Sequence, residues 1–174
     1  LGYHEAITFS FQNPRIQEKL DPDIEPFRLV NPISEDLSVM RTSVVPGLLQ
    51  ALVHNFNRQR QRVSLFETGL VFSCVEGTRI QEPSLGMVFA GRKNIEGWAN
   101  ESRETDFFDV KGDLEEILAL TGRSQDFSFV ADVRSGFHPG QTARIQRDGE
   151  GIGWLGAIHP EFSSSLGVET QVIA

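Results

Sequence analysis

Residues 29–72 carry the pattern that most constrains how this chain can fold: an extended segment, a capped helix and a second, longer strand. We predict the helix from about Val44 to Asn57, because Ser43 can cap it and Pro46 falls in its first turn, where a missing N–H costs little. The helix carries one apolar stripe at helical spacing, made of Val45, Leu48, Leu49, Leu52 and Phe56. The fold must bury this stripe against a sheet, a partner helix, or both.

The remaining segments are mostly strands that follow one another. Extended or alternating apolar patterns predict strands at 7–11, 27–31, 63–72, 85–90, 127–133, 142–147 and 152–158. Asp148 and Gly149 predict a hairpin turn between the last two strands. Further helices are expected at 15–20 and 109–120, the second with Asp109 as its N-cap, and irregular segments at 34–38 and 92–107. This order predicts an α+β fold, an antiparallel β-sheet flanked by helices, because a doubly wound sheet needs more helices between its strands.

Length and composition limit the classes of protein to which the chain can belong. Its 174 residues fit one domain, 1–174, and both ends look truncated, so we expect an excerpt of a longer protein. The single cysteine, Cys74, excludes an internal disulfide and favours a cytoplasmic setting. The net charge of −8 argues against a nucleic-acid clamp, and no apolar run reaches the roughly 20 residues of a membrane span.

Motifs that could carry chemistry have simpler structural explanations. The glycines of GIGWLG, residues 151–156, lie in a strand-like run with no helix after it, so close packing or a bulge explains them better than a dinucleotide site. His138 and His159 each precede a proline and lack metal-ligand spacing, which favours turn roles. A solvated acidic loop and a helix cap account for Glu101, Glu104, Asp106 and Asp109. We therefore predict no catalytic, cofactor-binding or metal-ligating residue.

One basic cluster is present, made of Arg58, Arg60 and Arg62 in the run RQRQR. It has no interleaved aromatic residues and lies in an acidic surround, so a solvated turn is the default explanation. A contact to RNA is the alternative that this cluster leaves open.

Six stretches, in order, cover nearly the whole chain and point to one family. They are GYHEAITFSF at 2–11, LVNPISEDLSVMRTSVVPGLLQALVHNFNRQ at 29–59, LFETGLVF at 65–72, DFFDVKGDLEEILALTG at 106–122, FHPGQTARI at 137–145 and GWLGAIHPEFSSSLGV at 153–168. In these stretches the chain resembles the catalytic-like core of the β subunit of bacterial phenylalanyl-tRNA synthetase. The resemblance implies a fold related to the catalytic domains of class II aminoacyl-tRNA synthetases.

The resemblance also implies a function for the whole assembly. It implies an α2β2 enzyme of the cytoplasm whose α subunit joins phenylalanine to tRNA(Phe), with ATP and magnesium as cofactors of the holoenzyme and none in this module. The family's β module keeps the architecture of a catalytic domain without its activity. Consistent with this, Ser73 stands where active relatives carry the arginine that neutralises the ATP α-phosphate. Losing such a charge weakens the stabilisation of the transition state.

The partners implied are the α subunit and, through the holoenzyme, tRNA(Phe). In class II enzymes the motif 1 helix builds subunit interfaces, so the resemblance places a candidate subunit interface around the predicted helix. Its residues are Met40, Arg41, Thr42, Leu48, Leu49, Leu52 and Phe56. Packing inside this chain's own core is the competing explanation for each of them.

Three hypotheses about function follow. The first is a non-catalytic module that supports α/β assembly and hence aminoacylation of tRNA(Phe) by the whole enzyme. The alternatives are a module with its own small-molecule or nucleotide site in a ligase-like fold, and a module that contacts tRNA directly through its arginine cluster. A deep pocket with two or more converging basic side chains favours the second hypothesis, whereas an apolar, plugged cleft disfavours it.

Overall fold

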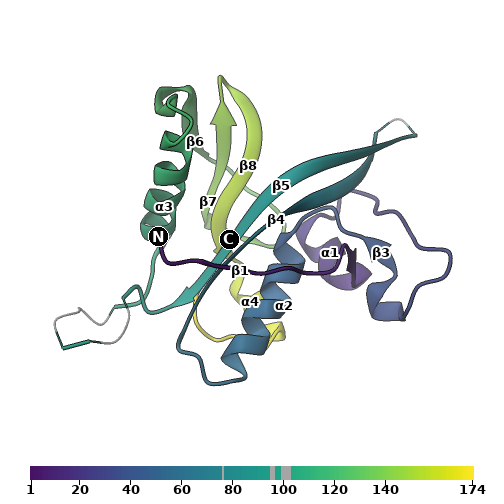
Figure 1. Cartoon of the computed structure of the whole chain (residues 1–174), viewed down its shortest axis with the longest axis horizontal. Helices are drawn as coiled ribbons and strands as arrows, with labels where there is room; N and C mark the ends of the chain where they lie inside the picture. The colour runs from purple at the N-terminus through teal and green to yellow at the C-terminus, as the bar shows by residue number, and fades with distance from the viewer. Residues whose placement is uncertain (76, 95–96, 99–102) are drawn as a thin grey trace.

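The chain folds into a seven-stranded sheet with helices on both of its faces (Figure 1). The computed structural model describes residues 1–75, 77–94, 97–98 and 103–174. Within them the sheet has the strand order β1-β4-β5-β9-β8-β7-β6. Its strands are β1 His4–Glu5, β4 Arg62–Val75, β5 Thr78–Gly91, β6 Phe127–Ala131, β7 Phe137–Arg147, β8 Glu150–Ile158 and β9 Val172–Ile173. β1 pairs with β4 in parallel and the other neighbours are antiparallel, which confirms the predicted α+β class.

The helices and a small second sheet complete the fold. A two-stranded sheet joins β2 Phe11–Gln12 to β3 Val39–Met40. The helices are α1 Pro14–Leu20, α2 Val45–Phe56, α3 Phe107–Ala119 and α4 Pro160–Ser165, with short 3-10 turns at Glu35–Leu37 and Ser124–Asp126. The predicted helices at 15–20 and 44–57 are therefore confirmed to within a residue.

Two hydrophobic clusters lie on opposite faces of the sheet. The stripe of α2 packs against alternate residues of β4 and β5, in a cluster that includes Leu48, Leu52, Val63, Leu65, Val88 and Ala90. The other cluster joins α3 to β7, β8 and the remaining face of β5, through Val110, Leu114, Phe89, Ile145 and Leu155. Because successive side chains of a strand point to opposite faces, Val88 and Phe89 of β5 serve different clusters. The sheet is thus covered by α2 on one face and by α3 on the other (Figure 1).

Several predicted boundaries were wrong. Only Phe11 of the expected strand 7–11 is a strand residue, and the hydroxyl of Thr8 donates to Glu67. The expected strand 27–31 reduces to one bridge, between Arg28 and Val39. The segment 34–38 is not simply loop, since it contains a 3-10 turn.

The N-cap of α3 was also predicted at the wrong residue. The cap is Asp106, and Asp109 occupies the third helical position, where the two form a reciprocal capping box. Asp109 N–H donates to Asp106 Oδ1 at 2.9 Å, and Asp106 N–H donates to Asp109 Oδ2 at 3.1 Å. At α2 the cap position is Val44, although Ser43 still accepts from Val45 N–H at 3.2 Å.

The turn and glycine predictions in the β7–β8 hairpin are confirmed. Asp148 and Gly149 have φ of 51° and 84°, the left-handed pair that a tight hairpin turn needs. The pairing of the two strands shifts register between Ile145 and Gln146, opposite Gly153 and Gly151, as the bulge interpretation predicts.

Candidate functional site

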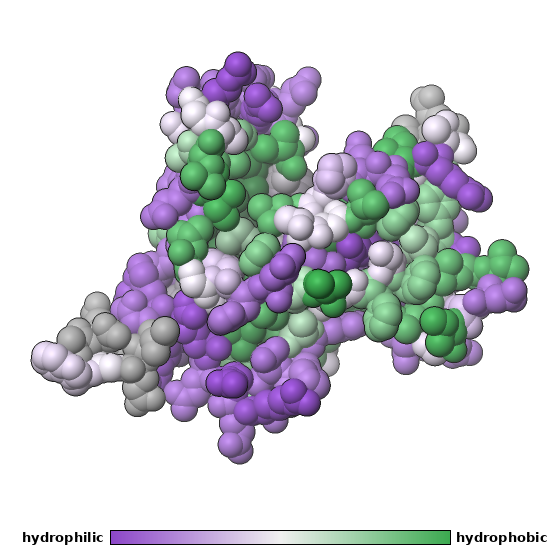
Figure 2. All heavy atoms as spheres, viewed as in Figure 1, coloured by the Kyte–Doolittle hydropathy of each residue, from purple (hydrophilic) through white to green (hydrophobic). Residues whose placement is uncertain are grey.

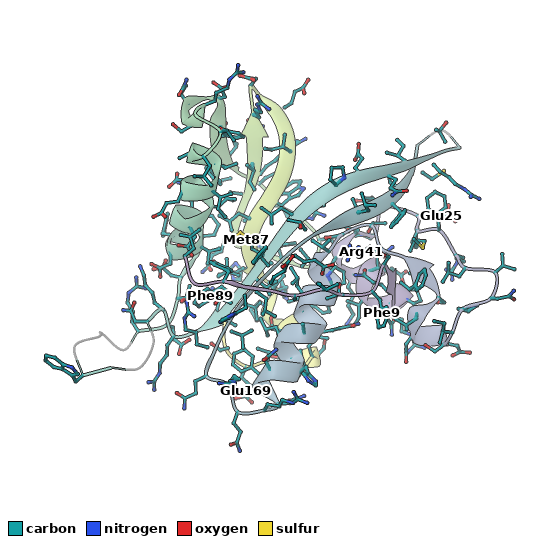
Figure 3. All side chains as sticks on the ribbon, viewed as in Figure 1. Phe9, Glu25, Arg41, Met87, Phe89 and Glu169 are labelled. Atoms are coloured by element: carbon teal, nitrogen blue, oxygen red, sulfur yellow. The ribbon has the colours of Figure 1, made fainter. Side chains whose placement is uncertain are left out.

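An apolar cavity lies over the β4–β5 hairpin, between the N-terminal segment and α3. Phe66 and Met87 are paired across the hairpin and share one wall, while Ile117 of α3 faces them. The cavity has a volume of about 440 Å³, and its described lining residues are Leu1, Gly2, Tyr3, Phe66, Leu85, Met87 and Ile117. No charged side chain is among them. Figure 3 shows Met87 and Phe89 on β5, near the place where the N-terminal segment crosses this strand.

A larger and more polar cavity, of about 660 Å³, adjoins the first around Tyr3. Two basic side chains, Arg62 and Lys93, line it together with two carboxylates, Asp109 and Asp113. Lys93 forms an ion pair with Asp109. Arg62 donates to the backbone oxygen of Lys93 at 3.3 Å and lies 4.9 Å from the centre of the Phe89 ring. The two cations of this cavity are therefore balanced by two carboxylates, and both already contact other groups of the chain.

Two titratable groups of the polar cavity have shifted pKa values. Two hydrogen bonds from Arg103, at 2.6 and 2.7 Å, hold the pKa of Asp109 far below its ordinary range, and Lys93 adds to this effect. Burial raises the pKa of Tyr3 well above its ordinary value, and the neighbouring charge of Asp113 raises it further. Tyr3 donates to Asp113 Oδ2 at 3.0 Å. Asp109 stays ionised and Tyr3 stays neutral at physiological pH, so neither is poised for acid–base chemistry.

A buried ion pair ties the residue that follows β3, Arg41, to Glu67 of β4. Arg41 and Glu67 are each 3% exposed, and Arg41 Nη1 donates to Glu67 Oε1 at 2.7 Å. Arg41 also donates to Leu70 O at 2.8 Å and to the Thr8 hydroxyl at 3.2 Å, while that hydroxyl donates to Glu67 Oε2 at 2.7 Å. A Cβ on Gly69 would lie 2.0 Å from Arg41 Nη2, so the guanidinium packs directly on this glycine. The charge of Arg41 is neutralised by Glu67, and its N–H groups donate to acceptors inside the fold.

His138 and His159 hydrogen-bond to the backbone. His138 Nδ1 accepts from Gly140 N–H at 3.1 Å, and His159 caps α4 by accepting from Glu161 N–H at 3.3 Å. Among the described residues, no group of three or more His, Cys, Asp or Glu side chains is placed to hold a metal ion. Of the acidic residues expected in a solvated loop, Glu101 lies outside the described residues, as do residues 95–96 and 99–102 of the segment 92–107 that was expected to be irregular.

Comparison with known proteins decides the family. Over residues 1–174 the sequence matches the family described as "Phenylalanyl tRNA synthetase beta chain CLM domain". The chain belongs to this family. It is 50% identical to the phenylalanine–tRNA ligase β subunit of Pseudomonas putida over 171 residues, and 44% identical to that of Vibrio cholerae over 175 residues. These alignments cover 98% and 99% of this chain but 22% of each relative, so the chain spans about a fifth of their length.

A solved structure supports the fold of this phenylalanyl-tRNA synthetase β chain module. The pyrrolysyl tRNA synthetase PylSc of Desulfitobacterium hafniense is similar with a TM-score of 0.66, at 12% sequence identity. The match covers 99% of this chain and 56% of that one. The expected class II synthetase-like architecture is therefore confirmed. No helix in the described part of the chain is long and apolar enough to cross a membrane.

The structure places the candidate interface residues of the module mainly inside it. Leu48, Leu49, Leu52 and Arg41 are at most 3% exposed and pack within this chain. Met40, Thr42 and Phe56 are half-buried, and Thr42 donates to Asp21 Oδ2 at 2.9 Å. The interface itself stays a prediction, but the surface that these residues offer to a partner is small.

The arginine cluster of the module is divided by the fold. Arg58 and Arg60 are exposed in the turn after α2, whereas Arg62 is the first residue of β4 and lines the polar cavity. Ser73 is half-buried near the end of β4, opposite Ile80. Its equivalence to the phosphate-binding arginine, and the RNA contact of the cluster, remain predictions.

Sequence reasoning missed the buried pair and the polar cavity. Glu67 gave one usable signal, because a lone carboxylate inside the apolar run VSLFETGLVF must have a buried partner. The lining of the polar cavity comes from segments far apart in the chain, and no local pattern connects Tyr3, Lys93 and Asp113.

Proposed function

We propose that this chain is a non-catalytic module of the β subunit of a phenylalanine–tRNA ligase. In this proposal the module supports assembly with the α subunit, and so aminoacylation of tRNA(Phe) by the whole α2β2 enzyme in the cytoplasm. ATP and magnesium act in the holoenzyme and not in this module. The main support is the apolar cavity over the β4–β5 hairpin, whose described lining offers no charged side chain to a triphosphate.

The buried arginine adds to this support. Arg41 is held by Glu67, Thr8 and the backbone of Leu70, and it is 3% exposed. A phosphate could recruit this guanidinium only by breaking a buried ion pair, which is strongly unfavourable. The buried Arg41 guanidinium is therefore unavailable for nucleotide chemistry.

Exposed apolar side chains supply a surface for assembly. Ile7 and Phe9 on the N-terminal segment are 90% and 70% exposed, and Val30 and Ile33 in the loop between α1 and β3 are 94% and 80% exposed. Figure 2 shows hydrophobic side chains along this segment and at the loop to its right. Such exposure is typical of surfaces that a partner covers. We assign the α-subunit contact to these four residues, in addition to the partly buried ones predicted from the sequence.

Replacing Ile7 and Phe9 together by Asp is expected to weaken assembly with the α subunit by at least about tenfold, because two carboxylates would be buried in an apolar interface. Both side chains are exposed in this chain, so the fold should tolerate the change. Co-purification and sedimentation of the co-expressed subunits measure assembly. The matched control is Leu120→Asp, which changes an 85% exposed residue at the end of α3. Equal assembly of both variants would contradict the assignment.

The alternative of a separate nucleotide site rests on Arg62 and Lys93 in the polar cavity. It is disfavoured because Asp109 and Asp113 balance their charge there. The number of ATP analogues bound per α/β pair, measured by equilibrium dialysis on the assembled enzyme, separates the two functions. We expect one, bound by the α subunit. Two per pair, with the second lost on Arg62→Ala, would overturn the non-catalytic proposal.

A further inference from the structure

The far edge of the sheet is an unpaired strand. β6, Phe127–Ala131, stands at the end of the strand order and pairs only with β7 (Figure 1). In the described part of the chain no strand lies on its other side. The opposite edge is formed by β1, which is two residues long. β6 is therefore the longer of the two edges that the sheet leaves open.

The hydrogen-bond pattern shows which backbone groups point away from the sheet. Asp132 N–H donates to Thr142 O at 3.1 Å. Since hydrogen-bonded and non-hydrogen-bonded pairs alternate along an antiparallel pair of strands, Val130 and Ser128 also exchange hydrogen bonds with β7. Phe129 and Ala131, opposite Ile145 and Ala143, occupy the non-hydrogen-bonded positions. Their N–H and C=O groups consequently face outward, away from β7. The N–H of Phe127 is already bound to Ser124 O.

The edge lacks the features that usually protect such strands. Its sequence, FSFVA, has no proline and no charge, and its pairing with β7 has no bulge. Ser128, Val130 and Ala131 are exposed, Val130 by 46%. Phe129 packs against the α3 cluster, which holds the strand to that face of the sheet. A fixed, extended and uncharged edge is a template for a further strand.

Charge at the two ends of β6 indicates the kind of segment that fits. Asp126 and Asp132 flank the strand, and neither is in an ion pair within the described residues. Three cations near β6 contact aromatic rings instead: Arg144 lies over Trp154 at 5.7 Å, Arg147 over Phe127 at 5.8 Å, and Lys111 over Phe129 at 4.6 Å. A second copy paired antiparallel about Phe129 would set Asp126 against Asp132, a like-charge contact. Charge therefore disfavours self-pairing.

We propose that β6 binds an extended segment of a partner protein by adding a strand to the sheet. The segment has an apolar centre flanked by lysine or arginine residues six positions apart, which pair with Asp126 and Asp132. This surface lies apart from the apolar residues assigned to subunit assembly, and the inference does not depend on the proposed function.

The test uses the complete protein that carries this chain and a labelled seven-residue peptide with lysine at each end and alternating valine and threonine between. Ala131→Pro removes one outward N–H without touching the ladder to β7 and should weaken binding by about tenfold, measured by fluorescence anisotropy. Ala131→Thr keeps that N–H and is the matched control, expected to bind as the parent does. A peptide with glutamate at each end should bind at least about tenfold more weakly than the lysine peptide.

A second variant keeps the proposal open to contradiction if Ala131→Pro misfolds. Asp126→Asn with Asp132→Asn leaves the backbone intact and should abolish the preference for the lysine peptide over the glutamate peptide. Unchanged preference in this variant, or unchanged affinity in a folded Ala131→Pro protein, overturns the proposal. So does a concentration-dependent dimer in sedimentation that Ala131→Pro dissociates, because the occupant of the edge would then be a second copy.

Discussion

Replacing Glu67 by Ala is expected to lower the free energy of unfolding by about 3–5 kcal/mol. The change leaves the Arg41 guanidinium buried, at 3% exposure, without the carboxylate that lies 2.7 Å from it. The Thr8 hydroxyl also loses its acceptor. Urea denaturation followed by circular dichroism measures the loss.

The double variant Arg41→Met with Glu67→Leu is the informative control. Replacing both partners of a buried ion pair by apolar residues is often neutral, so this variant should recover most of the stability lost in Glu67→Ala. Recovery attributes the loss to an unpaired buried charge. Loss below about 1 kcal/mol in the single variant would mean that water reaches Arg41 and that the pair is not buried.

Truncating the α2 stripe is expected to have an effect of similar size. Leu52 is 0% exposed and lies in the cluster between α2 and the β4–β5 hairpin. Leu52→Ala removes buried methyl groups and leaves a cavity, so the free energy of unfolding should fall by about 2–5 kcal/mol. Thermal and chemical denaturation of the chain measure this change.

The control for Leu52→Ala is the same substitution at an exposed position. Leu120 is 85% exposed at the end of α3, and Leu120→Ala should change the free energy of unfolding by less than about 0.5 kcal/mol. Equal losses at the two positions would contradict the assignment of the stripe to this chain's core. If Leu52→Ala lowered the free energy of unfolding only slightly, the stripe would be better explained as part of a subunit interface.

Local patterns predicted those elements whose signal lies within a few neighbouring residues. The α2 helix follows from its apolar spacing and from Pro46 in its first turn. The β7–β8 turn follows from Asp148 and Gly149, whose backbone is left-handed. The expected strand 7–11 was wrong except at Phe11. The contacts of this segment are long-range, such as that of Thr8 with Glu67, 59 positions away, and no alternation of residues records such a partner.

The candidate site was predicted less well than the fold for the same reason. The stripe of α2 was identified, but whether it faces a partner or the core depends on what the sheet places beneath it. Here Val63, Leu65 and Val88 cover it from within the chain. The exposed apolar surface lies instead at Ile7 and Phe9. The alternating pattern of this segment had predicted a half-buried strand there.

By itself the sequence determined the class of fold, the main helices and hairpin, and the family, because periodicity, turn residues and ordered motifs are properties of the linear chain. Only the tertiary structure decided that Arg41 is neutralised by Glu67, that the hairpin carries an apolar cavity, and that β6 is left as an open edge. Each of these depends on residues that are distant in sequence and meet only when the strands take their order in the sheet.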